Sequence, residues 1–358
     1  MADERLSRAA ARAYRVATHQ LQAGAAGAGE VGVLDTGIQD TPPGTVAHLA
    51  LAARLARPPA TGDGLALVHA ARGTMHVHRA ADLADLAAAL RPDETADLRP
   101  QTYGNYFAEH GVDAVAGLDA VAAAMAEVMA DGVRRTKGEL STALRSRVDK
   151  RFRPWCGSCG ADHVHDGLFR LASLPAGLRL VANGDGSADF VAGPPLGPAR
   201  PTARRDLVRR FVRYAGPTDR DGLAAWLGLS PAAARRWWSL VADELVRVDV
   251  EGRRLFLHQD DLALARDAPA PRGVRLLPPY DPVLELCDRA LLVPDPARRK
   301  QVWRPVANPG AVLDRGEVVA VWRRRGDTVT VTPFATLPAT TRRAIERDAG
   351  GTVVLAGA

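Results

Sequence analysis

Residues 204–257 carry the pattern that most constrains how this chain can fold. Hydrophobic periodicity and turn residues predict three helices and then two short strands, at 204–214, 219–227, 231–246, 246–250 and 253–257. This order is typical of a winged helix, whose third helix enters the DNA major groove while the hairpin touches the backbone. We therefore expect Arg235 and Arg236, on the third helix, to contact DNA. Winged helices also dock proteins, so the pattern leaves that second role open.

The rest of the chain adds a second predicted unit of this kind and a β-rich end. We interpret 115–155 as the helical part of another winged helix, and the short β-rich runs after residue 273 as a small sheet or barrel. The predicted fold is α+β, with tandem winged-helix (helix-turn-helix) units and a C-terminal small β-barrel. The expected domains are an N-terminal helical and hairpin region at 1–114, winged-helix units at 115–200 and 201–270, and a β-barrel-like region at 271–358.

Composition indicates a globular protein of a reducing compartment. Of the 358 residues, 47% are hydrophobic and 25% charged, and no apolar run approaches membrane-spanning length. The first residues carry acids and arginines where a signal peptide has its apolar segment, and three cysteines do not make a disulfide scaffold. We expect a cytoplasmic, nucleoid-associated monomer that makes no membrane contact.

The positive charge is locally concentrated, which makes nucleic acid the first partner to consider. The formal net charge is +6, and residues 134–154 alone hold eight basic residues against two acidic ones. A basic helix is often only a solvated face, but several separate basic clusters on one chain favour phosphate binding. Double-stranded DNA is therefore the expected partner. The residues expected to contact its phosphates are Arg145, Arg147, Lys150 and Arg151.

A polar loop precedes the helix predicted after Thr45. Pro42 and Pro43 cannot lie inside a helix, and Thr45 is a good N-cap, so the preceding residues form a rigid loop at a helix start. Gln39 and Asp40 are then adjacent polar groups on a constrained backbone. One interpretation makes them catalytic, and the other makes them ordinary turn and capping residues.

The segment 65–79 predicts two short strands around a turn at Arg72. Strand alternation places Thr74, His76 and His78 on one face. A single histidine on a strand is usually a core or surface residue. Two histidines and a threonine on one face are a stronger candidate for a functional site.

A short segment combines Cys156, Cys159, His163 and His165. Thiolate and imidazole are the ligands that tetrahedral zinc prefers, so this CxxC with two histidines predicts a structural zinc site. Four ligands so close along one chain would be strained, because zinc sites usually join two separated pairs. The alternative is a pair of reduced cysteines and two histidines in a turn.

Several segments distributed along the chain carry a family resemblance. They are 37–40 leading into 49–55, then 72–76, 136–140, 154–171, and 276–282 with 299–303. Together they resemble the winged-helix DNA-binding family that contains the AlkZ/YcaQ-type DNA glycosylases. The resemblance implies tandem winged helices and a C-terminal β-barrel around a DNA-lined cleft. It also implies hydrolysis of the N-glycosidic bond of bulky alkylated purines or crosslinked bases, with no cofactor required for catalysis.

This sequence departs from the family at the catalytic motif. Family enzymes carry Gln-x-Gln or Gln-x-Asp there. Here Gln39 matches the second Gln with Gly37 in the first place, or Asp40 matches the Asp with Ile38 in place of Gln.

Two functional hypotheses follow from the resemblance. As an enzyme, the protein would use Asp40 or Gln39 to position a water against the sugar. Thr74 and His76 would contact the DNA strand near an alkylated base, and Arg72 would contact a phosphate. The other hypothesis is a non-catalytic winged-helix DNA-binding protein, either a regulator or a damage-binding factor. Base release from alkylated DNA separates the two.

Overall fold

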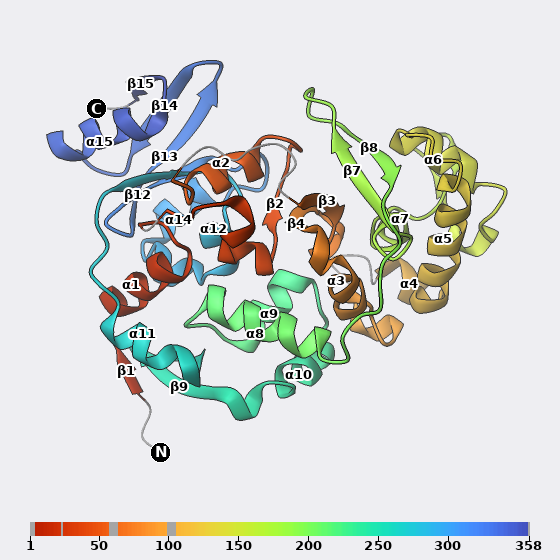
Figure 1. Cartoon of the computed structure of the whole chain (residues 1–358), viewed down its shortest axis with the longest axis horizontal. Coiled ribbons are helices and arrows are strands. Elements are labelled where there is room, and N and C mark those ends of the chain that lie inside the picture. The colour runs from red at the N-terminus through yellow and green to blue at the C-terminus, as the bar shows by residue number, and fades with distance from the viewer. Residues whose placement is uncertain (1–3, 23, 57–63, 99–104, 357–358) are drawn as a thin grey trace.

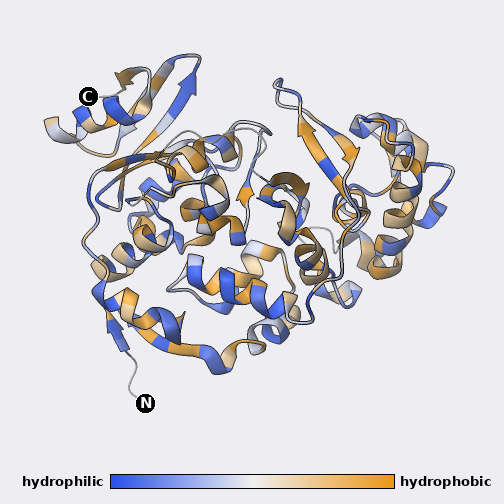
Figure 2. Ribbon diagram, viewed as in Figure 1, coloured by the Kyte–Doolittle hydropathy of each residue, from blue (hydrophilic) through white to orange (hydrophobic). Residues whose placement is uncertain are grey.

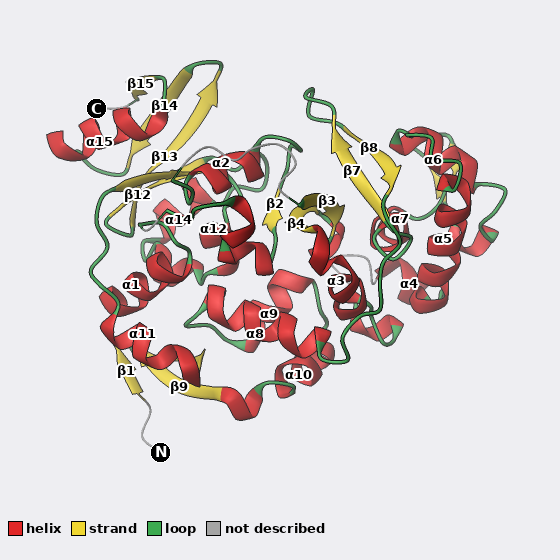
Figure 3. Cartoon of the chain, in the orientation of Figure 1, coloured by secondary structure: helices red, strands yellow, loops and turns green. Residues whose placement is uncertain are grey.

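The structure, a computed structural model, describes residues 4–22, 24–56, 64–98 and 105–356 (Figure 1). Helices and sheets are mixed along the chain, which agrees with the predicted α+β class (Figure 3). Helices α4 to α7 form an arm on the right of Figure 1, and most other elements pack into a larger body. In the described ranges, no helix combines the length and the apolar character needed to cross a membrane.

A five-stranded sheet in the order β2-β4-β3-β7-β8 lies between the body and the arm. Its strands are β2 Ile38–Gln39, β3 Leu65–His69, β4 Met75–Arg79, β7 Leu178–Ala182 and β8 Ala188–Ala192. The β3–β4 hairpin confirms the two strands predicted around Arg72. Strands β3 and β7 pair through Leu67 and Leu180, so the sheet takes strands from both sides of the predicted 114/115 boundary. The domain ranges stay a prediction.

The arm packs around an apolar core. Its helices are α4 Asn105–Glu109, α5 Ala114–Met129, α6 Lys137–Leu144 and α7 Asp166–Ser173, and a small hairpin joins β5 Trp155–Cys156 to β6 Ala161–Asp162. Helix α6 begins at a capping box in which Thr136 Oγ1 accepts from the Glu139 N–H and Glu139 accepts from the Thr136 N–H. Strands β7 and β8 contribute Leu178, Leu180 and Phe190 to the same core. Figure 2 shows hydrophobic residues along both strands.

The module predicted at 204–257 has the expected order of elements. It consists of α8 Ala203–Ala215, α9 Arg220–Leu227, α10 Pro231–Ser239, β9 Leu245–Val250 and β10 Arg253–His258. Helix α10 is shorter than predicted because the chain enters β9 at Leu245, where it pairs with His258 of β10. Trp237 is buried in the core, and Trp238 is only partly buried. That this module is a winged helix remains a prediction.

Apolar spacing predicts a single helix over residues 4–22, and the structure differs from this prediction. Residues Glu4–Leu6 form β1, which pairs in parallel with β9, and helix α1 covers Arg8–Thr18. Ser7 stops the helix from extending further back, since its side chain accepts a hydrogen bond from the Ala10 N–H at 3.0 Å as an N-cap. The strand depends on a partner more than two hundred residues away, which local periodicity cannot reveal.

The C-terminal β-barrel prediction is wrong, because this region is an open five-stranded sheet in the order β11-β12-β13-β14-β15. Its strands are β11 Val274–Leu277, β12 Gly310–Asp314, β13 Glu317–Arg325, β14 Thr328–Pro333 and β15 Thr352–Leu355. Strands β14 and β15 run parallel, and parallel neighbours need a crossover, here helix α15 Ala339–Ala349. Helix α15 packs against both edge strands, β11 and β15, and these edges are not paired with each other in the described sheet.

The remaining helices connect these layers. They are α2 Val46–Ala52, α3 Leu83–Leu90, α11 Leu262–Asp267, α12 Pro282–Leu286, α13 Arg289–Leu292 and α14 Pro296–Val302. A buried ion pair joins two of them. Arg54, just after α2, donates to both carboxylate oxygens of Asp281, the N-cap of α12, at 2.7 and 2.8 Å.

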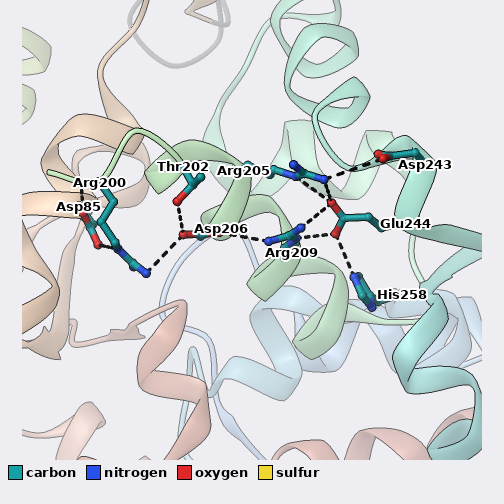
Figure 4. Close-up of polar contacts among 9 residues, drawn as sticks. All are labelled: Asp85, Arg200, Thr202, Arg205, Asp206, Arg209, Asp243, Glu244 and His258. Atoms are coloured by element: carbon teal, nitrogen blue, oxygen red, sulfur yellow. Dashed lines mark hydrogen bonds and ion pairs between the residues drawn. The ribbon is translucent and has the colours of Figure 1, made fainter.

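An ion-pair network covers α8 and neutralises much of the basic cluster at 204–213 (Figure 4). Arg205 and Arg209 both bind Glu244, which also contacts His258, and Asp206 contacts Arg209 and Arg200. The bond from Arg209 is the largest of the effects that lower the pKa of Glu244 to about 2. Glu244 binds Arg205 and Arg209 within the module itself, so the number of arginines on α8 overstates the charge available to DNA.

Candidate active site

A large cleft lies where β2, the turn before β4, helix α9 and the α12–α14 segment meet. Its volume is about 1080 Å³. The sequence-predicted residues Gln39, Arg72 and Thr74 line it from one side, and Tyr280 and Glu285 line it from the other. The structure therefore brings together residues that stand more than two hundred positions apart.

Gln39 reaches this cleft from the edge strand of the central sheet. It pairs with His76 of β4, and directly paired residues in antiparallel strands project to the same face. Its side-chain oxygen accepts a hydrogen bond from Arg72 at 3.3 Å. The amide is therefore held at the cleft wall by a strand pairing and by one side-chain contact.

Asp40 lies next to Gln39 but has a different environment. It is buried, and its two carboxylate oxygens accept hydrogen bonds from the backbone N–H groups of Gly44, at 2.6 Å, and Ala47, at 2.9 Å. Asp40 thus performs the capping role predicted for Thr45, whose side chain makes no cap hydrogen bond. A carboxylate has two acceptor oxygens, so it can hold the loop and the helix start together. Asp40 is not among the described residues that line the cleft.

The turn between β3 and β4 supplies Arg72 and Thr74. Arg72 adopts a positive φ of 56° and its guanidinium contacts Glu285 and the Trp226 carbonyl. Thr74 donates to the Ala71 carbonyl at 2.9 Å while still facing the cleft. The positive charge of Arg72 is therefore paired with the Glu285 carboxylate inside the cleft.

His76 lies beneath the cleft surface and is fully buried. Burial lowers its pKa, an effect that nearby Glu285 partly opposes. His76 Nε2 lies 4.0 Å from a carboxylate oxygen of Glu285. Because His76 is buried, a DNA strand can touch it only by entering the cleft.

Glu285 is the cleft residue that the sequence patterns missed. It lies in the short apolar helix α12, whose side chains otherwise pack inward, and its own side chain is 10% exposed. The one signal in the sequence is an acid among the apolar residues Val283, Leu284 and Leu286, one turn after the N-cap of α12. An acid at such a position needs a partner when buried.

Cationic side chains form the other rim of the cleft. Arg289, Arg299 and Lys300 line it, and the Arg289 guanidinium lies 5.1 Å from the centre of the Trp303 ring. Cations and an aromatic face together can hold a phosphate and a base. Arg299 and Lys300, from the basic segment 298–304, therefore border the same cleft as Gln39.

The basic segment of the arm is exposed but carries acid partners. Arg145 pairs with Asp162 at 3.0 Å, and Arg147 with Glu127 and Arg151 with Asp149 at 3.5 Å. Lys150 is exposed as well. Exposed ion pairs of this kind are weak, so phosphates can still compete for these cations.

The two arginines of α10 differ. Arg235 and Arg236 are both exposed, but among the described residues only Arg236 forms an ion pair with buried Asp97. The start of α10 is also held by the bond from the Ser230 N–H to the Asp97 carbonyl, at 2.7 Å. Arg236 therefore has a structural partner in addition to any contact with DNA.

Three of the four predicted metal ligands converge. One side-chain ligand atom from each of Cys156, Cys159 and His163 lies within 4.8 Å of the others. A hydrogen bond with Ser158 is the main cause that lowers the pKa of Cys156 to about 6, which favours the thiolate that metals bind. His165 lies elsewhere, stacked on Tyr106 with ring centres 4.3 Å apart.

Comparisons with known proteins agree with this architecture. The family model "DNA glycosylase AlkZ-like" matches residues 33–352. The interstrand DNA cross-link repair glycosylase of Streptomyces sahachiroi is 30% identical over 239 residues, an alignment that spans 61% of this chain and 61% of that protein. The solved structure of Streptomyces sahachiroi DNA glycosylase AlkZ superimposes with a TM-score of 0.76 at 24% identity, covering 98% of this chain and 100% of that one. Because the family model spans most of its length, the chain belongs to the AlkZ-like DNA glycosylase family.

Proposed function

We propose that this protein is a DNA glycosylase that hydrolyses the N-glycosidic bond of bulky alkylated purines in double-stranded DNA, including purines joined in an interstrand crosslink. The observation that supports this most is Gln39 on the wall of a cleft of about 1080 Å³ whose rim carries Arg289, Arg299 and Lys300. Cations at the rim suit phosphates, and the volume suits a bulky adduct. A relative named for crosslink repair supports the same substrate class.

The chemistry requires a positioned water and stabilised positive charge. An N7- or N3-alkylated purine is already cationic, so its departure needs no strong general acid. The remaining requirements are to hold water against the anomeric carbon and to stabilise the charge that develops on the sugar. We propose that the Gln39 amide orients the water or the sugar. Asp40 then fixes the loop that carries Gln39, through its bonds to Gly44 and Ala47.

A crosslink-unhooking assay tests the proposal. A duplex with one interstrand crosslink between alkylated purines should separate into two single strands on a denaturing gel after incubation with the protein. Alkali should then cleave the strand that gained an abasic site. If the crosslinked duplex is bound but remains joined, the protein is a damage-binding factor and the proposed activity fails.

DNA binding should depend steeply on salt, because each neutralised phosphate releases counterions. We propose that Arg145, Arg147, Lys150 and Arg151 supply part of this contact. Replacing all four by glutamine should reduce the slope of log affinity against log salt by about one unit per lost phosphate contact. A matched change of Arg209, Arg213 and Arg205, which are held by acids of the body, should alter the slope less. Fluorescence anisotropy at several salt concentrations measures both. An unchanged slope in the fourfold variant would contradict this assignment.

We also propose that Cys156, Cys159 and His163 bind a structural zinc ion. Their ligand atoms already lie within 4.8 Å of one another, close to the spacing around tetrahedral zinc. His163 Nδ1 donates to the Val164 carbonyl at 2.9 Å, which leaves Nε2 to bind the metal.

Protein purified without chelator should contain about one zinc per chain by elemental analysis. Cys156→Ser and Cys159→Ser should lose the metal together with thermal stability. His165→Ala is the matched control and should keep the zinc, because His165 stacks on Tyr106 away from the cluster. Metal-free wild-type protein, or loss of zinc in His165→Ala alone, would contradict the three-ligand site.

A further inference from the structure

We propose that His76 Nε2 and Glu285 together hold the hydrolytic water of this enzyme. The inference rests on the proposed glycosylase function and assigns the atoms that carry it out. It gives His76 a catalytic role beneath the cleft surface, and it gives Glu285 the role of the carboxylate that faces the reacting sugar.

The tautomer of His76 is set by its backbone. The Nδ1 atom lies 3.0 Å from the carbonyl oxygen of Thr74, so Nδ1 carries the proton and donates it. In the neutral ring, Nε2 is then an acceptor. Burial lowers the pKa of His76 and so favours this neutral form. Among the described residues, Nε2 has no hydrogen-bond partner, although it is fully buried.

Glu285 places a second hydrogen-bond acceptor near His76 Nε2. One of its carboxylate oxygens contacts Arg72, and the other lies 4.0 Å from His76 Nε2. Two acceptors at this separation cannot bond to each other. One water can donate to both, since hydrogen bonds of about 2.8 Å to each would subtend about 90° at its oxygen, near the angle between the two protons of water. The lone pairs of that oxygen remain free for attack.

The position of this pair suits attack on DNA. Glu285 and Gln39 both line the cleft, and Gln39 pairs directly with His76 across β2 and β4. The water would therefore lie between the buried imidazole and the open cleft, with the Gln39 amide beside it. Arg72 forms an ion pair with Glu285 and so holds the carboxylate in place.

The step balances as a hydrolysis. The water oxygen forms a bond to C1′ of the sugar while the C1′–N9 bond breaks, and the electron pair of that bond stays with the cationic purine, which leaves neutral. The water proton passes to His76 Nε2. The Glu285 carboxylate stabilises both the positive sugar and the imidazolium that results. His76 then returns its proton to solvent.

The decisive experiment compares single-turnover base release by wild-type protein, His76→Gln and Glu285→Gln on a duplex with one N7-alkylguanine. Each substitution should slow release by about 10²-fold, as for a lost general base, with DNA affinity unchanged. The double variant should be no slower than the slower single variant, because both residues act on one water. Asp221→Asn is the matched control, since this carboxylate lies in the same cleft with its side chain 89% exposed, and it should release base at the wild-type rate.

A pH profile separates this role from a structural one. Release should be constant at high pH and fall as pH drops, because protonation of His76 removes its acceptor. Glu285 raises the pKa of His76, whereas Arg72 lowers it. Asp40, His78 and His69 are titratable groups that also interact electrostatically with His76. In Glu285→Gln the acid limb should therefore move to lower pH.

The outcomes distinguish failure of the water site from failure of the glycosylase function. If wild-type protein releases base and both single variants release it at the wild-type rate, the water site is refuted while the glycosylase function stands. If both variants are slow but additive in the double variant, the shared water is refuted. If wild-type protein releases no base, the proposed function fails and this inference fails with it. Thermal unfolding of each variant confirms that it is folded.

Discussion

Gln39→Ala should slow base release from N7-alkylguanine DNA by about 10²-fold, the size expected when a group that positions a reactant is removed. The side chain lies at the cleft wall, where its oxygen accepts one hydrogen bond, from Arg72 at 3.3 Å. The pairing of Gln39 with His76 is made by the backbone and survives truncation. The fold and DNA affinity should therefore change little while the chemical step slows.

Asp40→Asn should lower the stability of the protein and slow base release less than Gln39→Ala does. An amide offers one acceptor oxygen where the carboxylate offers two, so one of the bonds to Gly44 and Ala47 is weakened. We expect a loss of stability of about 1 kcal/mol, as for a weakened helix cap, and a smaller fall in base release than in Gln39→Ala. Asp35→Asn is the control, since Asp35 pairs with Arg79 and lies outside the residues that line the cleft. If Asp40→Asn abolishes release in a protein of wild-type stability, Asp40 is itself the catalytic acid or base.

Arg54→Met should destabilise the protein by about 3–5 kcal/mol, the cost of leaving one member of a buried ion pair alone. Both side chains of the Arg54–Asp281 pair are fully buried. Arg54 also donates to the Ala50 carbonyl at 2.8 Å, and Asp281 caps α12 by accepting from the Val283 N–H at 3.0 Å. The pair thus ties the helix after the Gln39 loop to the helix that carries Glu285.

Urea unfolding measures the stability lost in Arg54→Met, and a variant of an exposed ion pair serves as the control. Glu251→Gln removes the partner of Arg8, and both side chains of that pair are substantially exposed. Such surface pairs contribute about 0–1 kcal/mol, so this control should be nearly neutral. Equal midpoints for Arg54→Met and Glu251→Gln would contradict the importance of the buried pair.

Local patterns predicted much of the fold. The spacing of Thr136 and Glu139 predicts the capping box that is present, and the turn at Arg72 predicts the β3–β4 hairpin. Both features depend only on neighbouring residues. The order of elements in 203–258 also follows from periodicity and turn residues. Helix and strand periodicity are local properties, so a single sequence displays them.

Features that depend on distant partners could not be predicted in this way. Glu4 joins a strand only because Val248 lies beside it, and Glu285 approaches His76 only in the folded chain. The basic cluster around Arg209 looked free in the sequence because Glu244, its acid partner, arrives from another element. The open C-terminal sheet likewise depends on where α15 packs.

The resemblance pointed to both Gln39 and Asp40, and the structure gives the two residues different surroundings. Gln39 lies in the cleft as the enzyme hypothesis required, whereas Asp40 has the environment of the capping interpretation. Two adjacent residues on an extended strand point to opposite sides, so they cannot both face one cleft without a break in the strand. The prolines predicted a loop for both residues, so this constraint applies only once the structure places Gln39 in β2.

The most direct test of the central claim uses wild-type protein and one duplex that carries a single N7-alkylguanine. Binding is measured by anisotropy, and release of the free base by chromatography, on the same samples under single-turnover conditions. We predict that the modified base appears in an amount equal to the abasic sites formed, with the strand left intact until alkali is added. Saturated binding with no free base would contradict it.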